Sequence, residues 1–309
     1  MILVLHNRYR TTGGEERAVA DLLWLLRERL EEDAELLERD SATLGRARAA
    51  AGLLRGGLEP EDVAAAVRRT GARIVHAHNL NPAFGWRALA AARAAGARVV
   101  MHLHNYRLVC AVGTCFTRGA DCTRCHARNT IPGAALACRG DRAEAAVYAT
   151  GLALWQRRLA AAVDAFAVPS SAARERLEVL GAPLDGRASV VPHFVRGFAE
   201  ASRAGAGSHA LVASRLAPEK GVDVAVDACA TAGVPLMVAG DGPEAAALRA
   251  RAARAGTDVR FAGRVDDSAL AELRAPRRRR LHSAPRSRTR RCRSRRARRW
   301  RARRARPGP

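Results

Sequence analysis

The stretch ARIVHAHNLNPAFGWRALAAARAAGARVVMHLHN (Ala72–Asn105) decides the fold class of this chain. It opens with a short apolar run at 72–79, continues with an alanine-rich segment of helical spacing at 82–96, and closes with a second apolar run at 97–105. Short apolar runs on either side of a helical segment are typical of two buried strands joined by a helix. A unit of this kind predicts a parallel sheet in an α/β protein.

The same alternation of strands and helices continues on both sides of this unit. We expect further strands at 2–6, 34–40, 164–171 and 188–193, and further helices at 16–30, 60–71, 141–163 and 171–181. The stretch 41–59 gives no clear prediction. Together these elements predict one complete doubly wound, Rossmann-like domain over residues 1–193.

A second, shorter alternation follows a linker. Residues 194–208 are rich in Gly, Ala and Ser without a clear period, which is typical of a connecting segment. We then expect strands at 210–216, 235–242 and 258–265, and helices at 221–233, 243–256 and 266–275. These elements amount to about half of a doubly wound domain, so residues 209–275 are predicted to form a partial one.

The basic charge of the chain is concentrated at its end. The chain has 53 Lys and Arg residues and 30 Asp and Glu residues, and 17 of the arginines but none of the acids follow Pro276. The remaining 36 basic and 30 acidic residues leave the rest of the chain with a net charge of only +6. The arginine-rich tail at 276–309 has too few apolar residues and too much like charge to fold, so we expect it to be disordered.

This tail raises nucleic-acid or anionic-surface binding as an alternative function. Its 17 arginines would attract phosphates strongly and without regard to sequence. The tail holds one aromatic residue, Trp300, and no recognisable nucleic-acid-binding motif. We therefore predict no specific nucleic-acid partner.

The apolar runs of the sequence are short. None approaches the roughly 18 apolar residues that a membrane span requires. The opening MILVLH (Met1–His6) is too short for the apolar core of a signal peptide and has no basic stretch before it. We therefore expect a cytoplasmic protein, in which cysteines stay reduced.

Six phrases stand in order at the ends of the predicted strands. They are NRYRTTGGEERAV, RIVHAHNLNP, VVMHLHNYRLVC, SRLAPEKGVDVAV, VAGDGPE and VRFAGRV. Together, across residues 1–275, they resemble the family-4 glycosyltransferases, whose GT-B architecture sets two Rossmann-like domains across a cleft. The resemblance implies a GT-B-like fold, here with an incomplete second domain, and a retaining transfer of sugar from a nucleotide-diphosphate sugar.

The resemblance also implies the partners of the protein. The N-terminal domain would bind a glycan or lipid-linked acceptor for a cell-envelope polysaccharide, and the C-terminal domain would bind the nucleotide-sugar donor. The family's chemistry requires no divalent cation, so no catalytic cofactor is expected. A lipid-linked acceptor would bring the protein into peripheral contact with the inner face of the membrane.

Gly13 and Gly14 join the first predicted strand to the first helix. Glycines let backbone N–H groups approach a phosphate, and the N-terminus of a helix favours negative charge. The resemblance implies that this turn contacts the donor phosphates or the acceptor. A plain turn is the alternative.

Arg215 and Lys220 bracket the turn in SRLAPEKG, after the first strand of the second predicted domain. The resemblance implies that they hold the donor diphosphate, because fixed cations stabilise the negative charge that gathers on it as it departs. A solvated surface pair is the alternative. The resemblance also implies that His104 lies beside the donor sugar and phosphates as a third catalytic residue, and that Arg264 lines the nucleotide pocket.

Three more histidines lie near His104 in the sequence. His102 should share a strand face with His104, and His76 and His78 form a similar pair one strand earlier. Four histidines at one sheet edge raise the idea of a metal site. A two-residue spacing also arises from ordinary packing alternation, so we expect no metal there.

Five of the seven cysteines lie within an insertion at 108–140 that is rich in Gly, Thr and Arg. Cys110, Cys122, Cys125 and Cys138 could hold one structural Zn²⁺ tetrahedrally, and the CxxC pair would supply two of the ligands from one turn. A metal would explain how a segment with little core of its own becomes ordered.

Other interpretations of these cysteines stay open. Cys115 is left over in the zinc assignment, and His126 could replace one thiolate. The cysteines could instead be reduced and in part buried, or the CxxC pair could be redox-active.

The resemblance also implies a Glu-x7-Glu motif that this sequence does not contain. The sequence has no acidic residue after Glu272. Alanine codons of a GC-rich gene, read one base later, give arginine and proline, so we hypothesise a shifted reading frame near Ala275. Translation of the other two frames beyond that codon should restore a strand–helix alternation and the Glu-x7-Glu motif, and the hypothesis is wrong if neither frame does so.

Overall fold

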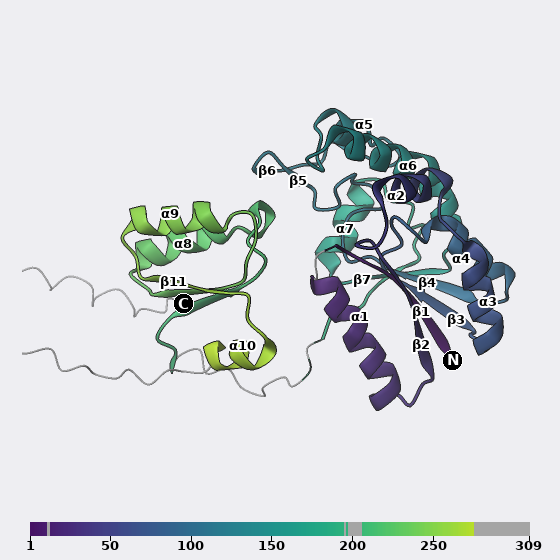
Figure 1. Cartoon of the computed structure of the whole chain (residues 1–309), viewed down its shortest axis with the longest axis horizontal. Coiled ribbons are helices and arrows are strands. Elements are labelled where there is room, and N and C mark those ends of the chain that lie inside the picture. Colours follow the sequence, from purple (N-terminus) through teal and green to yellow (C-terminus); the bar gives the residue numbers. More distant parts are fainter. Residues whose placement is uncertain (11–12, 195, 197–205, 275–309) are drawn as a thin grey trace, which may run out of the picture.

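The computed structural model describes residues 1–10, 13–194, 196 and 206–274 (Figure 1). Within these residues the chain forms two parallel β-sheets, each with helices on both faces, and one small antiparallel hairpin. The predicted α/β fold class is confirmed. The arginine-rich tail and most of the predicted linker lie outside the described residues.

In the described part of the chain, the larger sheet has six strands. They are β1 (Ile2–Arg8), β2 (Ala34–Asp40), β3 (Ile74–Ala77), β4 (Arg98–His102), β7 (Ala165–Val168) and β8 (Ala188–Val190). All neighbouring strands are parallel, and their order is β2-β1-β3-β4-β7-β8. The order of the strands reverses between β1 and β3, so this point is the topological switch point of the sheet.

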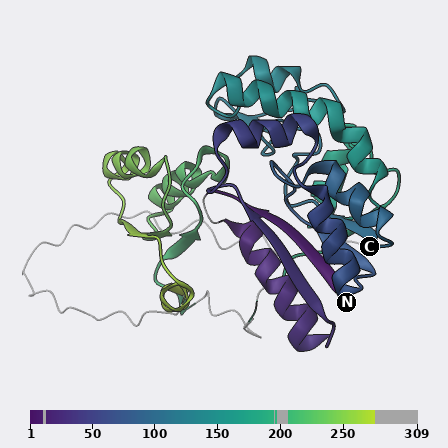
Figure 2. The same cartoon turned by 45° about the vertical axis from the view of Figure 1, so that its right-hand side comes forward.

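Helices cover both faces of the larger sheet. They are α1 (Gly14–Trp24) with the π-helical turn η1 (Leu25–Arg29), α2 (Arg46–Arg55), α3 (Pro60–Thr70), α4 (Gly85–Ala94), α6 (Arg142–Ala161) and α7 (Ser171–Val179). Because side chains alternate along a strand, Leu3 and Leu5 join the core that includes α3 and α4, whereas Val4 joins the core that includes α1. Figure 2 shows the purple α1 on one side of the sheet and the blue and teal helices on the other.

Two helices differ from the prediction. The expected helix at 16–30 begins earlier, at Gly14, and becomes π-helical at Leu25. Helix α2 lies in the stretch 41–59, where the sequence gives no clear prediction. Gly52 interrupts the helical pattern there, and a Cβ on Gly52 would lie 2.4 Å from the carbonyl oxygen of Pro82. The close packing of α2 against Pro82 therefore requires glycine at position 52. The same glycine makes the helix hard to predict from the sequence, because glycine is unfavourable inside helices.

The cysteine-rich insertion forms small elements joined by loops. Strands β5 (Phe116–Thr117) and β6 (Ala120–Asp121) make an antiparallel hairpin, and α5 (Ile131–Ala135) is a short helix that packs against α6. The backbone of the insertion bonds to the domain beside it, for example from Ala127 N–H to the carbonyl oxygen of Leu180 at 2.7 Å. The insertion therefore lies against the larger sheet's helical layer.

The smaller sheet has three strands within the described residues. They are β9 (Ala210–Ala213), β10 (Leu236–Ala239) and β11 (Val259–Gly263), parallel and in the order β11-β10-β9. The helices are the 3-10 turn η3 (Pro218–Lys220), α8 (Val222–Ala232), α9 (Ala245–Ala255) and α10 (Asp267–Arg274). Val238 of β10 packs with α8 and α9, and Met237 packs with α10 on the opposite face. Figure 1 shows α8 and α9 on one side of the smaller sheet and α10 on the other. No helix among the described residues is both long and apolar enough to cross a membrane.

Candidate functional site

The carboxyl edge of the larger sheet is lined with histidines. His6 lies in the buried part of β1, His78 follows β3, His104 follows β4, and His193 follows β8. Open α/β sheets bind ligands outside the carboxyl ends of their strands at the switch point. The histidines of β1 and β3 flank that point, so this edge is the candidate site.

His104 lies in the middle of a chain of imidazole rings. Its Nε2 atom is 2.7 Å from Nδ1 of His78, and its Nδ1 atom is 3.2 Å from Nε2 of His193. The rings of His102 and His104 are stacked with their centroids 4.3 Å apart. Side chains therefore join the carboxyl ends of strands that are distant in sequence.

Burial keeps these imidazoles neutral. It lowers the pKa of His104 to about 2, that of His102 to about 3 and that of His76 to about 4. Neighbouring histidines lower the pKa of His104 further, because a second positive charge nearby is unfavourable. At neutral pH the rings can donate and accept hydrogen bonds, but they supply no positive charge.

One nitrogen from each of His78, His102 and His104 lies within 4.8 Å of the other two. Three neutral imidazoles at this spacing have the chemistry of a transition-metal site. The sequence predicts no metal here, and the hydrogen bond between His78 and His104 already uses two of the ring nitrogens. The Nε2 atoms of His78 and His102 are buried without a hydrogen-bond partner among the described residues.

A polar network lies beside the histidines. The Tyr9 hydroxyl donates to Glu15 Oε2 at 2.7 Å, and Arg107 Nη1 lies 3.3 Å from the Tyr9 oxygen and 3.2 Å from Asn79 Oδ1. Burial raises the pKa of Glu15 to about 7, against the opposing effects of Tyr9 and Arg107. Glu15 therefore changes charge near neutral pH, at the N-terminus of α1.

The sequence analysis does not identify Glu15 or Arg107 as site residues. An acid in the first turn of a helix is a common stabilising feature, so Glu15 gives no functional signal by itself. Together with His78, Asn79 and His104, both side chains line a cavity of about 60 Å³. Only the fold brings them together, because Glu15 lies in the first turn of α1 and Arg107 lies on the loop after β4.

The loop that carries Arg215 is held by a glycine turn. The Leu216 N–H donates to the Asp241 carbonyl at 2.9 Å, and a Cβ on Gly240 would lie 1.8 Å from the Ser214 carbonyl oxygen. A Cβ on Gly242 would likewise lie 2.3 Å from the Leu216 carbonyl oxygen. The glycines of the phrase VAGDGPE are therefore needed for close contact between the two backbones.

Lys220 ends η3, directly before Gly221 and the start of α8. Arg215 forms an ion pair with Glu219, which the sequence analysis does not predict. Both predicted cations thus lie on one loop at the carboxyl end of β9. Arg264 follows β11 at the same edge of the smaller sheet and is exposed.

Gly13 is the N-cap of α1 and Gly14 is its first residue, so the two glycines link β1 to α1, as the sequence predicts. Gly13 has an extended backbone, and its N–H donates to Glu16 Oε2 at 2.7 Å. Nothing lies within 4 Å of the position of a Cβ on Gly14. Neither glycine is required by the local packing, so the space beside Gly14 is open to a ligand.

The sequence of the first domain matches a known family. Residues 13–193, more than half of the chain, match the model described as "Glycosyl transferase 4-like domain". The chain belongs to the glycosyltransferase 4-like family. It is therefore a glycosyltransferase by family, as its resemblance to family-4 enzymes predicts. No curated protein matches the chain significantly.

Solved structures of three proteins are similar to the glycosyltransferase. HepE of Anabaena in complex with UDP is 18% identical, with a TM-score of 0.48 over 88% of this chain and 71% of that one. The lipopolysaccharide outer core galactosyltransferase WaaB, in its apo form, is 14% identical, with a TM-score of 0.47 over 88% and 70%. MurG of Acinetobacter baumannii is 14% identical, with a TM-score of 0.38 over 87% and 68%. The family assignment itself rests on residues 13–193.

The predicted site residues of the glycosyltransferase fall into separate groups. His104 contacts His78 and His193, whereas Arg215 contacts Glu219. In the described part of the chain, no hydrogen bond or ion pair joins His104 to the loop of Arg215. The cysteines form a third group, which lines a cavity within the insertion.

Proposed function

We propose that this glycosyltransferase transfers a sugar from a nucleotide-diphosphate sugar to a glycan or lipid-linked acceptor, with retention of the anomeric configuration. Family membership supports the class of reaction. Transfer breaks the bond between the anomeric carbon and the diphosphate oxygen, so negative charge gathers on the departing diphosphate. Catalysis depends on groups that stabilise this charge more in the transition state than in the ground state.

One observation carries the donor half of the proposal. Arg215 and Lys220 lie on a loop that the glycine turn at Gly240 holds at the carboxyl end of the smaller sheet. Lys220 also directly precedes Gly221, the N-cap of α8, and the N-terminal N–H groups of this helix favour an anion. Two cations and a helix N-terminus on one braced loop would bind a diphosphate and stabilise it as it departs.

His104 would act as a neutral hydrogen-bonding group. Its low pKa means that it would not pair with the diphosphate as a cation at neutral pH. An imidazole held between His78 and His193 could donate one hydrogen bond to a phosphate oxygen or a sugar hydroxyl, if a ligand displaces one of these contacts. Gly14, with open space beside it, would admit the phosphate or the acceptor.

A second cavity would receive the acceptor. It has a volume of about 340 Å³ and lies beside α2 and α6. Four arginines line it: Arg10, Arg46, Arg107 and Arg139. The acidic residues along it are Asp141 and Glu144, and Glu144 is paired with Arg139 at 2.8 Å. This excess of positive charge favours an anionic acceptor, such as a diphosphate-linked glycan.

A diphosphate-linked lipid acceptor would bring the protein to the inner face of the membrane as a peripheral, cytoplasmic enzyme. The reaction would serve the synthesis of a cell-envelope polysaccharide and would use no catalytic metal. Because no acidic residue follows Glu272, the chain contains no Glu-x7-Glu pair for the donor sugar and ribose. We therefore expect weak donor binding and low or absent activity, with Arg264 as a further nucleotide contact.

Calorimetric titration of the full chain with UDP and GDP tests the donor half of the proposal. Arg215→Ala and Lys220→Ala should each weaken binding about tenfold or more, since a hydrogen bond to a charged group contributes about 1.5–3 kcal/mol. Arg254→Ala, at an exposed position in the last turn of α9, is the matched control and should bind as the wild type does. Equal binding by all three variants and the wild type would refute the assignment.

A further inference from the structure

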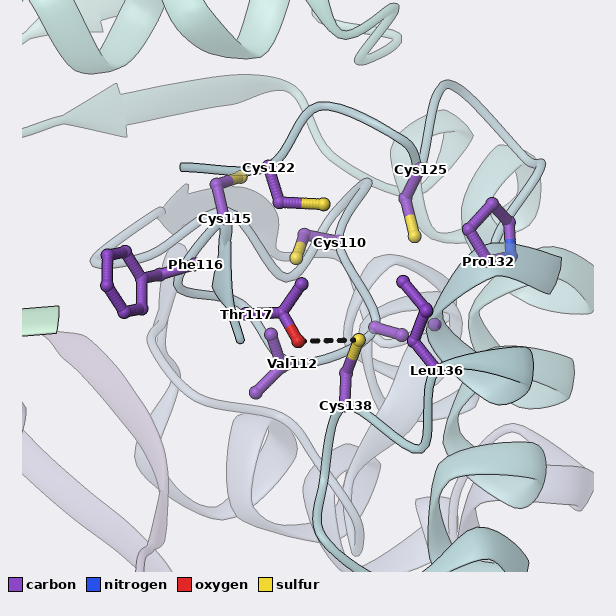
Figure 3. Close-up of a pocket in the computed structure, with 12 residues that line it drawn as sticks. Cys110, Val112, Cys115, Phe116, Thr117, Cys122, Cys125, Pro132, Leu136 and Cys138 are labelled. Carbon is purple, nitrogen blue, oxygen red and sulfur yellow. Dashed lines mark hydrogen bonds between the residues drawn. The ribbon is translucent and has the colours of Figure 1, made fainter. Parts of the chain in front are cut away.

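Five cysteines of the insertion surround one small cavity. Cys110, Cys115, Cys122, Cys125 and Cys138 line it, with a volume of about 10 Å³, room for about one water-sized sphere. All five are free thiols. Figure 3 shows the sulfur atoms of Cys110, Cys122, Cys125 and Cys138 turned toward a shared space, with Cys115 beside Cys122 at its edge.

The four sulfurs come from three segments of the insertion. Cys110 lies in the loop after β4, Cys122 and Cys125 share the segment after β6, and Cys138 follows α5. The insertion has little regular structure of its own to bring these loops together. Four of its non-glycine residues adopt a positive φ between 46° and 52°: Cys115, Arg118, Ala127 and Ala137. Strained loops of this kind persist only where other interactions hold them in place.

Polar groups surround the sulfur atoms as they do in structural metal centres. The N–H of Gly113 donates to Cys110 Sγ at 3.4 Å, and the Thr117 hydroxyl lies 3.6 Å from Cys138 Sγ. The hydrogen bond that Cys110 Sγ accepts favours its thiolate form and orients the sulfur for a metal.

We propose that Cys110, Cys122, Cys125 and Cys138 bind one Zn²⁺ as a structural centre. Four thiolates are the ligand set that Zn²⁺ takes in closed tetrahedral sites, and CxxC is a common spacing for two of them. Within the described residues, no three of the cysteine sulfurs lie within 4.8 Å of one another. Bound zinc would draw the sulfurs inward, by side-chain rotation about a cavity that already fits a single ion.

Cys115 is not a ligand in this assignment. Its thiol interacts with the guanidinium of Arg176, which is also paired with Asp121 at 2.7 Å. The positive charge of a guanidinium beside a sulfur repels a metal cation and disfavours metal binding there. Cys115 therefore provides a control inside the same cavity, and Cys229 in α8 provides one outside it.

The centre would stabilise the loop that carries candidate site residues. Cys110 lies a few residues after His104 and Arg107, and its N–H donates to the Tyr106 carbonyl at 2.8 Å. A metal bond at Cys110 would restrict that loop, and with it the contacts of Arg107 to Tyr9 and Asn79. The role is structural, so it is independent of the proposed transfer reaction.

The test is the metal content of the full chain, expressed with added zinc, purified without chelators and measured by mass spectrometry of the metals. We expect about one zinc per chain in the wild type and in Cys115→Ser and Cys229→Ser. Cys122→Ser and Cys138→Ser should lose nearly all of it. Because these variants could fail to fold, a second measurement uses the wild type alone: titration with an organomercurial should release zinc as four thiols react.

Several results would overturn the proposal. Wild type without zinc, zinc retained by both Cys122→Ser and Cys138→Ser, or thiols found in disulfides would each do so. The variant His78→Gln tests whether the metal lies among the histidines instead. If His78→Gln loses zinc and Cys138→Ser keeps it, the histidines and not the cysteines bind the metal. Zinc that depends on Cys115 and not on Cys138 would show that the ligand set is wrong.

Discussion

Nδ1 of His78 lies 2.7 Å from Nε2 of His104, so a hydrogen bond between neutral imidazoles joins the ends of β3 and β4. This bond requires one ring to donate and the other to accept. Protonation of both rings would leave two donors facing each other. The arrangement of the site therefore depends on imidazoles that remain uncharged.

The first prediction is a loss of stability in mild acid. Burial lowers the pKa of His76 to about 4 and that of His102 to about 3, whereas the unfolded chain takes up these protons near pH 6.5. The unfolded state thus binds more protons below pH 6.5, so the free energy of unfolding falls as the pH falls through that value. Urea unfolding at about pH 7.5 and pH 5 should show the loss.

His76→Phe tests which residues cause this loss. His76 stacks on His78 and His102, with centroid distances of 4.8 Å and 5.7 Å, and phenylalanine keeps a stacked ring that does not titrate. The variant should lose less stability than the wild type between the two pH values. His209→Gln, in the second domain, should lose as much as the wild type does. An unchanged pH dependence in His76→Phe would contradict the prediction.

The second prediction concerns Glu15, which has the opposite pH dependence. Burial raises its pKa to about 7, so the folded state holds more protons than the unfolded state between about pH 4.5 and pH 7. The free energy of unfolding therefore falls as the pH rises through this range. Glu15→Gln keeps the size of the side chain and an acceptor for Tyr9, but it does not titrate.

Glu15→Gln should therefore be more stable than the wild type at about pH 8.5, by on the order of 1 kcal/mol, and about equal to it at pH 5. Thermal unfolding at the two pH values measures this difference. Glu28→Gln, at an exposed position in η1, is the control and should match the wild type at both. A variant that is less stable at high pH would show that the Glu15 carboxylate is stabilising.

The strand–helix alternation was enough to predict the two parallel sheets. Apolar runs such as 72–79 and 97–105 became β3 and β4, and Pro60 and Gly71 set the ends of α3. The alternation could not predict α2, because Gly52 serves a contact with Pro82 that is distant in sequence. Local signals predict local structure, and close packing between distant segments overrides them.

The site was less predictable than the fold. His104 was predicted at the carboxyl end of a strand, and it lies there. Its bonds to His78 and His193, the raised pKa of Glu15 and the ion pair between Arg215 and Glu219 depend on distances between side chains. No sequence pattern gives such distances. The catalytic and binding roles of the predicted residues stay predictions.

The third prediction compares two glycines of the smaller sheet's domain that both have a positive φ. A Cβ on Gly240, at φ 150°, would lie 1.8 Å from the Ser214 carbonyl oxygen, whereas nothing lies within 4 Å of a Cβ on Gly256, at φ 62°. Gly256→Ala should therefore cost only about 1 kcal/mol of backbone strain. Gly240→Ala must also move the backbone of the Arg215 loop.

Gly240→Ala should destabilise the protein by about 3 kcal/mol or more and weaken UDP binding, since a displaced loop would misplace Arg215. Urea unfolding and calorimetric titration measure the two effects. If the two glycine variants were equally stable and bound UDP equally well, the glycine turn would not be what holds the loop.

The fourth prediction is a gain of function at the donor loop. Arg215 is paired with Glu219 on an exposed surface, and a diphosphate would have to compete with that carboxylate. Glu219→Gln removes the competing charge. Because an exposed ion pair contributes up to about 1 kcal/mol, UDP binding should tighten by up to about fivefold at low ionic strength, as calorimetric titration would measure.

Asp258→Asn is the control. It removes the same charge, but the pair that it breaks, with Arg260 at 3.3 Å, lies at the opposite end of the sheet. Tighter binding in both variants would indicate a general effect of net charge, and weaker binding in Glu219→Gln would show that Glu219 holds Arg215 in position for the nucleotide.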